Sequence, residues 1–252
     1  MRLDIESAAQ YHRDGFLQID ELFTPDEVQA MLDGTAGEKV AGNAWDAADG
    51  NGRAARLALW TDIADDVWGA VSSNPRIVNT IRTLQGEDIA FFHGKVILKM
   101  AETGGAFEWH QDYGYWYDQG FLFPRMMSAF VALDHCTIDN GCLEVLRGSH
   151  RLGRLNHGAL GGQTGIVAER LEQVKGHFEH VHCVMKPGSV LFFDCNLIHG
   201  SKPNTSRSHR RSFIMCYNAL ANPTLWANPN LSTVPCPVSA DGAILGYATS
   251  KA

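Results

Sequence analysis

The sequence has no uninterrupted apolar run of about 18 residues, the length that a membrane-spanning helix requires. Its first ten residues, MRLDIESAAQ, contain acidic side chains and no apolar core, so we expect neither a signal peptide nor a membrane anchor. These absences predict a soluble, intracellular protein of the cytoplasm that has no membrane partner.

Cysteine pairs with metal-site or redox spacing are also missing. The chain has six cysteines, but no CxxC pair occurs, so neither a zinc ribbon nor a dithiol redox motif is indicated. Most of the cysteines lie in apolar segments such as LFFDC (191–195) and SFIMC (212–216), where a free thiol behaves as a small hydrophobic group. A reducing compartment fits this pattern.

Concentrated positive charge is absent as well. There are 21 Lys and Arg residues against 28 Asp and Glu residues, which gives a net charge of -7 and argues against a nucleic-acid partner. Hydrophobic residues make up 45% of the chain and charged residues 19%, which is typical of a soluble globular protein with a large core. No internal repeat or linker-like tract divides the 252 residues, so we expect a single domain.

Residues 1–88 are predicted to form a helix-rich support. The segment TPDEVQAMLDG (24–34) has an N-cap threonine followed by proline and ends on glycine, and two further helices are indicated over 65–73 and 75–86. Residues 221–252, which include Trp226, are expected to form a C-terminal loop or lid.

Residues 89–220 are predicted to form a β core. Five short strands are predicted, with turn signals between several of them. The predicted strands are AFFHGKVILKM (90–100), RMMSAFVALDHC (125–136), GCLEVLRGSH (141–150), GSVLFFDC (188–195) and RSFIMCYNAL (211–220). Many short strands with long connections favour a mainly β fold with flanking helices, a jelly roll or double-stranded β-helix of the cupin kind.

The segment FEWHQDYGYWY (107–117) places two metal-type ligands among aromatic rings. If it is a strand, His110 and Asp112 project from the same face and can reach one ion. The strongest candidate for a third ligand is His199, in FFDCNLIHGSKPN (192–204). Two histidines and one carboxylate on one side of a metal form the arrangement of non-haem Fe(II) oxygenases, in which three positions stay open.

Four sequence segments, in the same order along the chain, resemble those of one enzyme family. The histidine and aspartate pair is preceded by YHRDGFLQIDELFTPDEV (11–28) and followed by DNGCLEVLRGSH (139–150) and KPGSVLFFDCNLIHGSKPN (186–204), and Arg210 lies eleven residues after His199. Over residues 9–218 the chain resembles the phytanoyl-CoA dioxygenase family of Fe(II)/2-oxoglutarate oxygenases, which includes ectoine hydroxylases. The resemblance implies Fe(II) on His110, Asp112 and His199, with 2-oxoglutarate and O2 as co-substrates.

The resemblance also assigns residues to the co-substrate. Arg210 is expected to bind the distal carboxylate of 2-oxoglutarate through a bidentate contact that lysine cannot supply, with Arg211 as the alternative if the strand register differs by one. Further contacts are implied for Ser201, Phe107, Lys95 and Phe130. A carboxylate at Asp112 occupies the position that related halogenases leave free for chloride, so hydroxylation with release of succinate and CO2 is expected.

The aromatic residues after Asp112 suggest a pocket for a small-molecule substrate. Tyr113, Tyr115, Trp116 and Tyr117 favour a compact cation through cation–π contacts, although a core-facing stripe explains them equally well. With Lys95 and Arg125 nearby, we expect a small metabolite of zwitterionic, quaternary-ammonium or aminophosphonate type.

Three alternatives stay open. His177, His180 and His182 form another cluster that could bind metal, although a polar strand or loop face explains it too. The chain could be a catalytically inactive jelly-roll binding protein, because fold alone does not guarantee activity. It could also be a zinc-dependent hydrolase that uses the same three ligands, since zinc accepts them.

Overall fold

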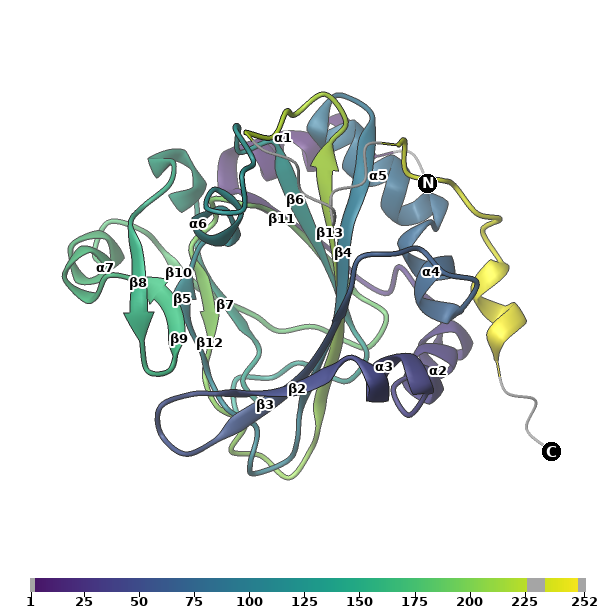
Figure 1. The fold of residues 1–252 in the computed structure, drawn as a ribbon, viewed down its shortest axis with the longest axis horizontal. Coiled ribbons are helices and arrows are strands. Elements are labelled where there is room, and N and C mark those ends of the chain that lie inside the picture. Colours follow the sequence, from purple (N-terminus) through teal and green to yellow (C-terminus); the bar gives the residue numbers. More distant parts are fainter. Residues whose placement is uncertain (1–2, 226–233, 249–252) are drawn as a thin grey trace.

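The computed structural model describes residues 3–225 and 234–248 and has two antiparallel sheets that face each other (Figure 1). The larger sheet has the order β1 (Phe16–Ile19), β11 (Val190–Asp194), β6 (Met126–Ala132), β13 (Arg210–Ala219), β4 (Ile89–Lys99), β3 (Ala54–Trp60) and β2 (Ala44–Ala48). The smaller sheet has the order β10 (His180–Cys183), β7 (Leu143–Leu146), β12 (His199–Ser201) and β5 (Phe107–His110). This is the predicted jelly roll.

Helices cover the outer face of the larger sheet (Figure 1). They are α1 (Ile5–Asp14), α2 (Pro25–Gly34), α3 (Glu38–Gly42), α4 (Val67–Ser72) and α5 (Pro75–Gln85). The predicted helix at 24–34 is confirmed, because Thr24 and Glu27 form a reciprocal capping box and Pro25 occupies the first turn. Helix α5 ends where Gly86 adopts a positive φ of 75°.

On the other side, β8 (His157–Leu160), β9 (Gln163–Ile166) and α7 (Ala168–Lys175) lie outside the smaller sheet (Figure 1). Two short 3₁₀ turns, η1 (Ser149–Leu152) and η2 (Ala243–Tyr247), complete the described elements together with α6 (Asp112–Trp116). No helix among the described residues is long and apolar enough to cross a membrane.

All five strands predicted after residue 89 are present, whereas β1, β2, β3, β8, β9 and β12 were not predicted. Of the missed strands, β1 and β2 form the two edges of the larger sheet and β3 lies beside β2. Strands β8, β9 and β12 are only three or four residues long. Strand β2, for example, reads AWDAA and is partly exposed throughout, so it lacks the apolar alternation that marks a strand. Tertiary pairing with β3 therefore determines its conformation.

Alternation along β13 separates two hydrophobic clusters. Phe213, Met215 and Tyr217 pack with the helices, whereas Ile214 and Cys216 point between the two sheets. A third cluster lies between the smaller sheet and α7. All six cysteines are free and buried.

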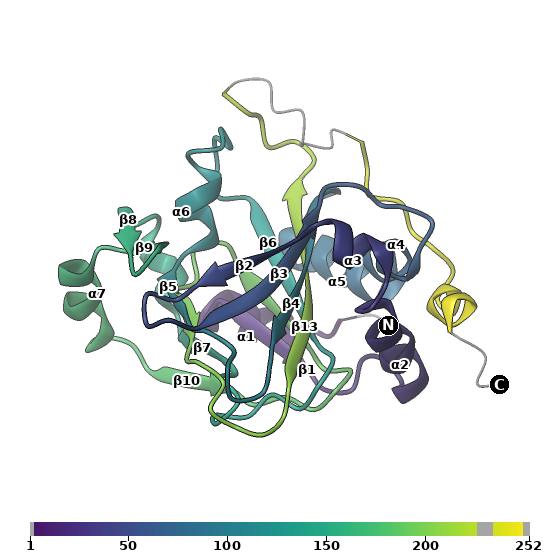
Figure 2. The same ribbon diagram turned by 60° about the horizontal axis from the view of Figure 1, so that its bottom comes forward.

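Residues 234–248 of the C-terminal region lie on the helical side of the molecule, whereas residues 221–225 pair with the segment that follows α6. Cys236 donates its backbone N–H to Ile89, Ser239 donates to Ser73, and η2 lies beside α2 and α4 (Figures 1 and 2). Trp226, which was assigned to a possible lid, lies outside the described residues.

Candidate metal and co-substrate site

Two histidines meet on neighbouring strands of the smaller sheet. Strand β12 pairs with β5 so that His199 lies opposite His110, and their ring centroids are 4.2 Å apart. The antiparallel pairing thus brings together two imidazoles that are far apart in the chain, and both are at the inner side of the sheet.

Asp112 reaches the same point, but not by the predicted route. Strand β5 ends at His110 and Asp112 is the first residue of α6, so the prediction that both side chains share one face of a strand is wrong. The turn into the helix brings Asp112 Oδ1 within 3.9 Å of Nε2 of each histidine, and one donor atom from each residue lies within 4.8 Å of the others. The three donors therefore converge from a strand, a helix start and a second strand.

Hydrogen bonds to atoms outside the cluster orient the three donors toward one point. Nδ1 of His110 lies 2.6 Å from the carbonyl oxygen of Glu108, and Nδ1 of His199 lies 2.9 Å from that of Leu197, which leaves both Nε2 atoms facing the cluster. Ser128 donates to Asp112 Oδ2 at 2.8 Å and leaves Oδ1 facing the imidazoles. Metal-binding histidines are held in this way through their second nitrogen.

The donor set fits a divalent transition metal. Nitrogen and oxygen ligands bind such an ion at about 2.0–2.2 Å, which places adjacent donors roughly 3 Å apart. The present spacing of 3.9 Å requires only a small inward movement of the side chains. The set has two nitrogens and one oxygen, as in the facial arrangement that holds non-haem iron.

The protonation states also suit a metal. Burial and the neighbouring His199 lower the pKa of His110 to about 3, and burial lowers the pKa of His199. Burial alone would raise the pKa of Asp112, but the charge of Lys95 and the nearby histidines hold it below its usual value. Both imidazoles are consequently neutral and the carboxylate ionised at neutral pH, which is the form that binds a cation.

A narrow cavity of about 50 Å³ runs from this cluster into the space between the sheets. Seven of the predicted site residues line it, namely Lys95, Phe107, His110, Phe130, His199, Ser201 and Arg210. The structure thus brings together the histidines of the metal cluster and the residues assigned to 2-oxoglutarate.

Arg210 occupies the far end of this cavity and is 1% exposed. Its guanidinium donates to the carbonyl oxygen of Gly141 and to Ser212, and its Nη2 lies 3.5 Å from Ser201 Oγ. Within residues 3–225 and 234–248, no carboxylate forms a salt bridge with it. A buried cation without an anionic partner is costly, so this position favours binding of an anion.

Lys99 places a second buried basic side chain next to Arg210, and sequence reasoning did not identify it. Its Nζ lies 2.7 Å from Ser201 Oγ and 5.5 Å from the centroid of the Phe107 ring. Burial and the adjacent Arg210 lower the pKa of Lys99 to about 6. A signal existed in the sequence, since Lys99 follows Lys95 by four residues in an otherwise apolar strand and shares its face.

Arg211 points to the opposite face of β13 from Arg210. It makes two 2.8 Å contacts with the carboxylate of Asp134. The alternation of β13 therefore directs one arginine into the cavity and holds the other in an ion pair outside it.

The four aromatic residues assigned to a substrate pocket point in different directions. Tyr115 lies against the His110 ring at 5.5 Å, and its hydroxyl donates to the carbonyl oxygen of Thr164. Tyr113 donates to the carbonyl oxygens of Phe121 and Leu122, and Trp116 packs on Phe92.

Of the other residues assigned to the substrate region, Tyr117 is 39% exposed and lies under Arg154. Arg125, the second cation expected near the substrate, pairs with Glu87.

Residues 11–212 match the phytanoyl-CoA dioxygenase (PhyH) family. The chain belongs to this family. It is 29% identical to the ectoine dioxygenase of Sphingopyxis alaskensis, over 87% of this chain and 77% of that protein. It is 26% identical to the L-proline trans-4-hydroxylase of Streptomyces griseoviridis, over 86% of this chain and 87% of that protein.

Solved structures of PhyH-family relatives agree with this assignment. EctD from S. alaskensis with bound Fe superposes with a TM-score of 0.77 at 25% identity, covering 94% of this chain and 87% of that one. EctD with 2-oxoglutarate and 5-hydroxyectoine gives a TM-score of 0.73 at 28% identity, covering 93% and 82%. The predicted enzyme class is confirmed: this PhyH-family chain is a non-haem iron, 2-oxoglutarate-dependent dioxygenase.

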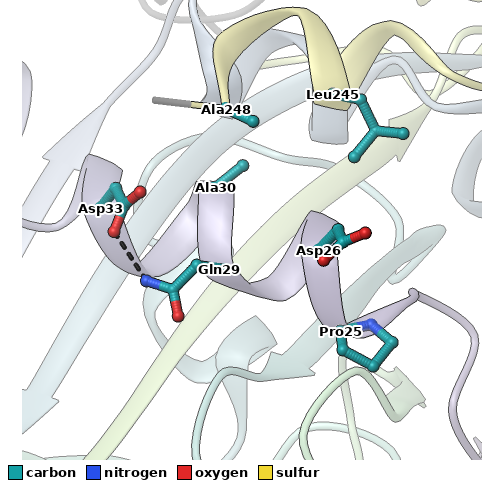
Figure 3. Close-up of a pocket in the computed structure, with 7 residues that line it drawn as sticks. All are labelled: Pro25, Asp26, Gln29, Ala30, Asp33, Leu245 and Ala248. Carbon is teal, nitrogen blue, oxygen red and sulfur yellow. Dashed lines mark hydrogen bonds between the residues drawn. The ribbon is translucent and has the colours of Figure 1, made fainter. Parts of the chain in front are cut away.

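A larger hollow elsewhere lacks comparable chemistry. It has a volume of about 680 Å³ and lies between α2 and η2, where it is lined by Pro25, Asp26, Gln29, Ala30, Asp33, Leu245 and Ala248 (Figure 3). Its polar groups include Gln29, which donates to Asp33 at 2.7 Å, and its lining contains no imidazole or thiol. The smaller cavity at the His and Asp cluster is therefore the candidate active site of the PhyH-family chain.

Three further side chains near the cluster escaped the sequence analysis. Ser128 lies in the apolar strand β6 and holds Asp112, and Gln111 accepts a hydrogen bond from Leu155 while its amide donates to Gly153 and Asn196. His93, on β4, is 6% exposed and has no described hydrogen-bond partner at Nδ1. A polar residue within an apolar strand was the available signal for Ser128 and His93.

Proposed function

We propose that this PhyH-family dioxygenase hydroxylates an unactivated C–H bond of a small zwitterionic metabolite and releases succinate and CO2. One observation carries the residue assignment. His110 and His199, which converge with Asp112, line one end of a cavity. The buried Arg210 lies at the other end without a carboxylate partner among the described residues. Such a two-ended cavity suits a linear dianion that must reach both a metal and a cation.

The proposed assignment gives each residue a task. His110, Asp112 and His199 hold Fe(II), and Arg210 with Ser201 binds the distal carboxylate of 2-oxoglutarate. Bound Fe(II) supplies the redox chemistry that couples oxidation of 2-oxoglutarate by O2 to hydroxylation of the substrate. Phe107 and Phe130 flank the co-substrate and keep water from it.

Lys95 is assigned to the metal end of the co-substrate. It lines the cavity, and its charge acts on Asp112, His110 and His199. A cation at this place would pair with the carboxylate of 2-oxoglutarate that lies nearer the iron. Because Arg210 lies at the far end, cations would flank both ends of the dianion.

The proposed substrate is a compact zwitterion, for which the two named relatives provide chemical precedent. Ectoine and proline are both small rings that carry a nitrogen cation and a carboxylate. In this chain the Tyr115 ring lies beside His110, and His93 offers a buried ring nitrogen without a described partner. An aromatic face attracts an alkylammonium group, and an imidazole nitrogen can bond to a polar group of the substrate.

A substrate panel would test this proposal. Protein supplied with Fe(II), 2-oxoglutarate and O2 should release succinate with cyclic amino acids, ectoine-like rings, quaternary-ammonium compounds or aminophosphonates, and the Asp112→Ala variant should release none. Asp134→Ala provides the matched control, because that carboxylate pairs with Arg211 outside the cavity. Turnover of only lipid thioesters would overturn the substrate class, and full activity of Asp112→Ala would overturn the ligand set.

A further inference from the structure

A second group of potential metal ligands lies on the outer face of the smaller sheet. Two of its members, His180 and His182, belong to the histidine cluster noted in the sequence, and the third is Glu144 on the neighbouring strand β7. Strand pairing accounts for the group, since His182 lies opposite Glu144 and His180, two residues earlier, lies on the same face of β10. His177 precedes β10, is exposed and does not belong to the group.

The two imidazoles point at one carboxylate. His180 Nε2 lies 2.8 Å from one oxygen of Glu144, and His182 Nε2 lies 3.7 Å from the other. The two rings are stacked with centroids 4.6 Å apart and planes inclined by 28°, so their nitrogen edges face the same side. One donor atom from each residue lies within 4.8 Å of the other two.

Burial separates this group from an ordinary surface cluster. The carboxylate of Glu144 is 4% exposed, whereas the histidine side chains are 40% and 29% exposed. Among the described residues, its ion-pair and hydrogen-bond partners are these two imidazoles. A buried carboxylate favours a cation as partner, and the exposed histidine edges give an ion access from solvent.

We infer that Glu144, His180 and His182 bind a divalent ion of the zinc type as a second metal site. Two imidazole nitrogens and a carboxylate oxygen are a common zinc ligand set, and water from the exposed side would complete a tetrahedron. On loading, Nε2 of His180 gives up its hydrogen bond with Glu144, and Nε2 of both histidines binds the ion. This assignment does not depend on the activity proposed for the inner cavity.

The outer site is connected to the inner one through a single pair of strands. Glu144 lies opposite Gly200, and the adjacent residue Val145 lies opposite His199. Trp109 closes one side of the outer group: its ring contacts His180 edge-on at 5.3 Å, and a Cβ at Gly200 would lie 3.3 Å from that ring. A metal at the outer site therefore ties β10 to β7, the strand that supports His199.

Zinc titration would test the inference in the full-length chain. The Asp112→Ala variant lacks a ligand of the inner site, so it should bind one equivalent of Zn(II) at the outer site, as measured by competition with a chromophoric chelator. Loss of a residue that hydrogen-bonds to a metal ligand costs about 10–100-fold in metal affinity. Removal of a ligand itself should therefore cost more than about 100-fold. We expect that loss when His182→Ala or Glu144→Gln is added to Asp112→Ala.

His177→Ala on the same background is the matched control, because it removes an exposed histidine of the same segment and should leave zinc affinity unchanged. Thermal melts without metal should show that each variant is folded, and Glu144→Gln keeps the shape of the buried side chain. Failure of the Asp112→Ala chain to bind zinc would overturn the inference, and so would equal affinity in the His182→Ala and His177→Ala variants.

Discussion

Ser128 donates a 2.8 Å hydrogen bond to the Asp112 oxygen that faces away from the two imidazoles. The bond fixes which carboxylate oxygen is presented to an ion and joins β6 of the larger sheet to α6. The metal site thus depends on both sheets, although its histidines come from only one of them.

The Ser128→Ala variant should bind Fe(II) about 10–100-fold more weakly than wild type, because Asp112 loses the partner that orients it. Anaerobic Fe(II) titration measures this affinity. Ser72→Ala is a suitable control, since Ser72 is also buried but donates within α4, away from the cluster. Unchanged iron affinity in Ser128→Ala would show that Asp112 needs no such support.

Arg210→Lys should raise the apparent KM for 2-oxoglutarate by at least about tenfold, because lysine cannot make a bidentate contact with a carboxylate. Arg211→Lys should leave this KM unchanged and weaken only the surface ion pair with Asp134. Steady-state kinetics with 2-oxoglutarate as the varied component distinguishes the two variants. The opposite pattern would move the carboxylate site to Arg211.

Binding of 2-oxoglutarate should become tighter as the pH falls from about 9 to about 6.5. The pKa of Lys99 is lowered to about 6 in the free protein, so Lys99 is mostly neutral in this range. An anion next to Arg210 and Ser201 would raise that pKa, and binding would then take up a proton. Affinity should change by up to about tenfold per pH unit.

Anaerobic calorimetry of the iron-loaded protein, in buffers of different ionisation enthalpy, measures this proton uptake. Lys99→Met should remove both the uptake and the pH dependence. A pH dependence in Lys99→Met equal to that of wild type would assign the proton to another group.

Tyr113 and Tyr115 should respond differently to substitution. Tyr113→Phe removes the donor to two carbonyl oxygens and should lower the free energy of unfolding by about 1–3 kcal/mol, with no effect on substrate KM. Tyr115→Ala removes the ring beside His110 and should raise substrate KM. Urea unfolding and steady-state kinetics measure the two effects, and a substrate effect from Tyr113→Phe alone would reverse the assignment.

The elements that local pattern determines could be predicted from the sequence. Helix α2 begins at the predicted residue because its N-terminal cap is a local signal, and the five predicted strands from Ile89 onward follow their apolar runs. The position of Asp112 was predicted with the wrong geometry, since nothing local marks the change from strand to helix after His110.

Long-range pairing explains what the sequence could not predict. The opposition of His110 and His199 depends on the register of β5 and β12, which the sequence does not show. The two residues were grouped beforehand only as candidate ligands and by resemblance to the PhyH family. The closeness of Lys99 to Arg210 depends in the same way on the register of β4 and β13. The group around Glu144 was missed because its carboxylate lies on a different strand from its histidines.

Anaerobic titration of the metal-free protein with Fe(II) in the presence of 2-oxoglutarate tests the central claim most directly. The visible charge-transfer absorption of the iron and 2-oxoglutarate complex should saturate at one equivalent in wild type and in Glu144→Gln. It should be lost in Asp112→Ala and in His199→Ala. An Asp112→Ala protein that titrates like wild type would contradict the assignment of His110, Asp112 and His199 as the iron ligands.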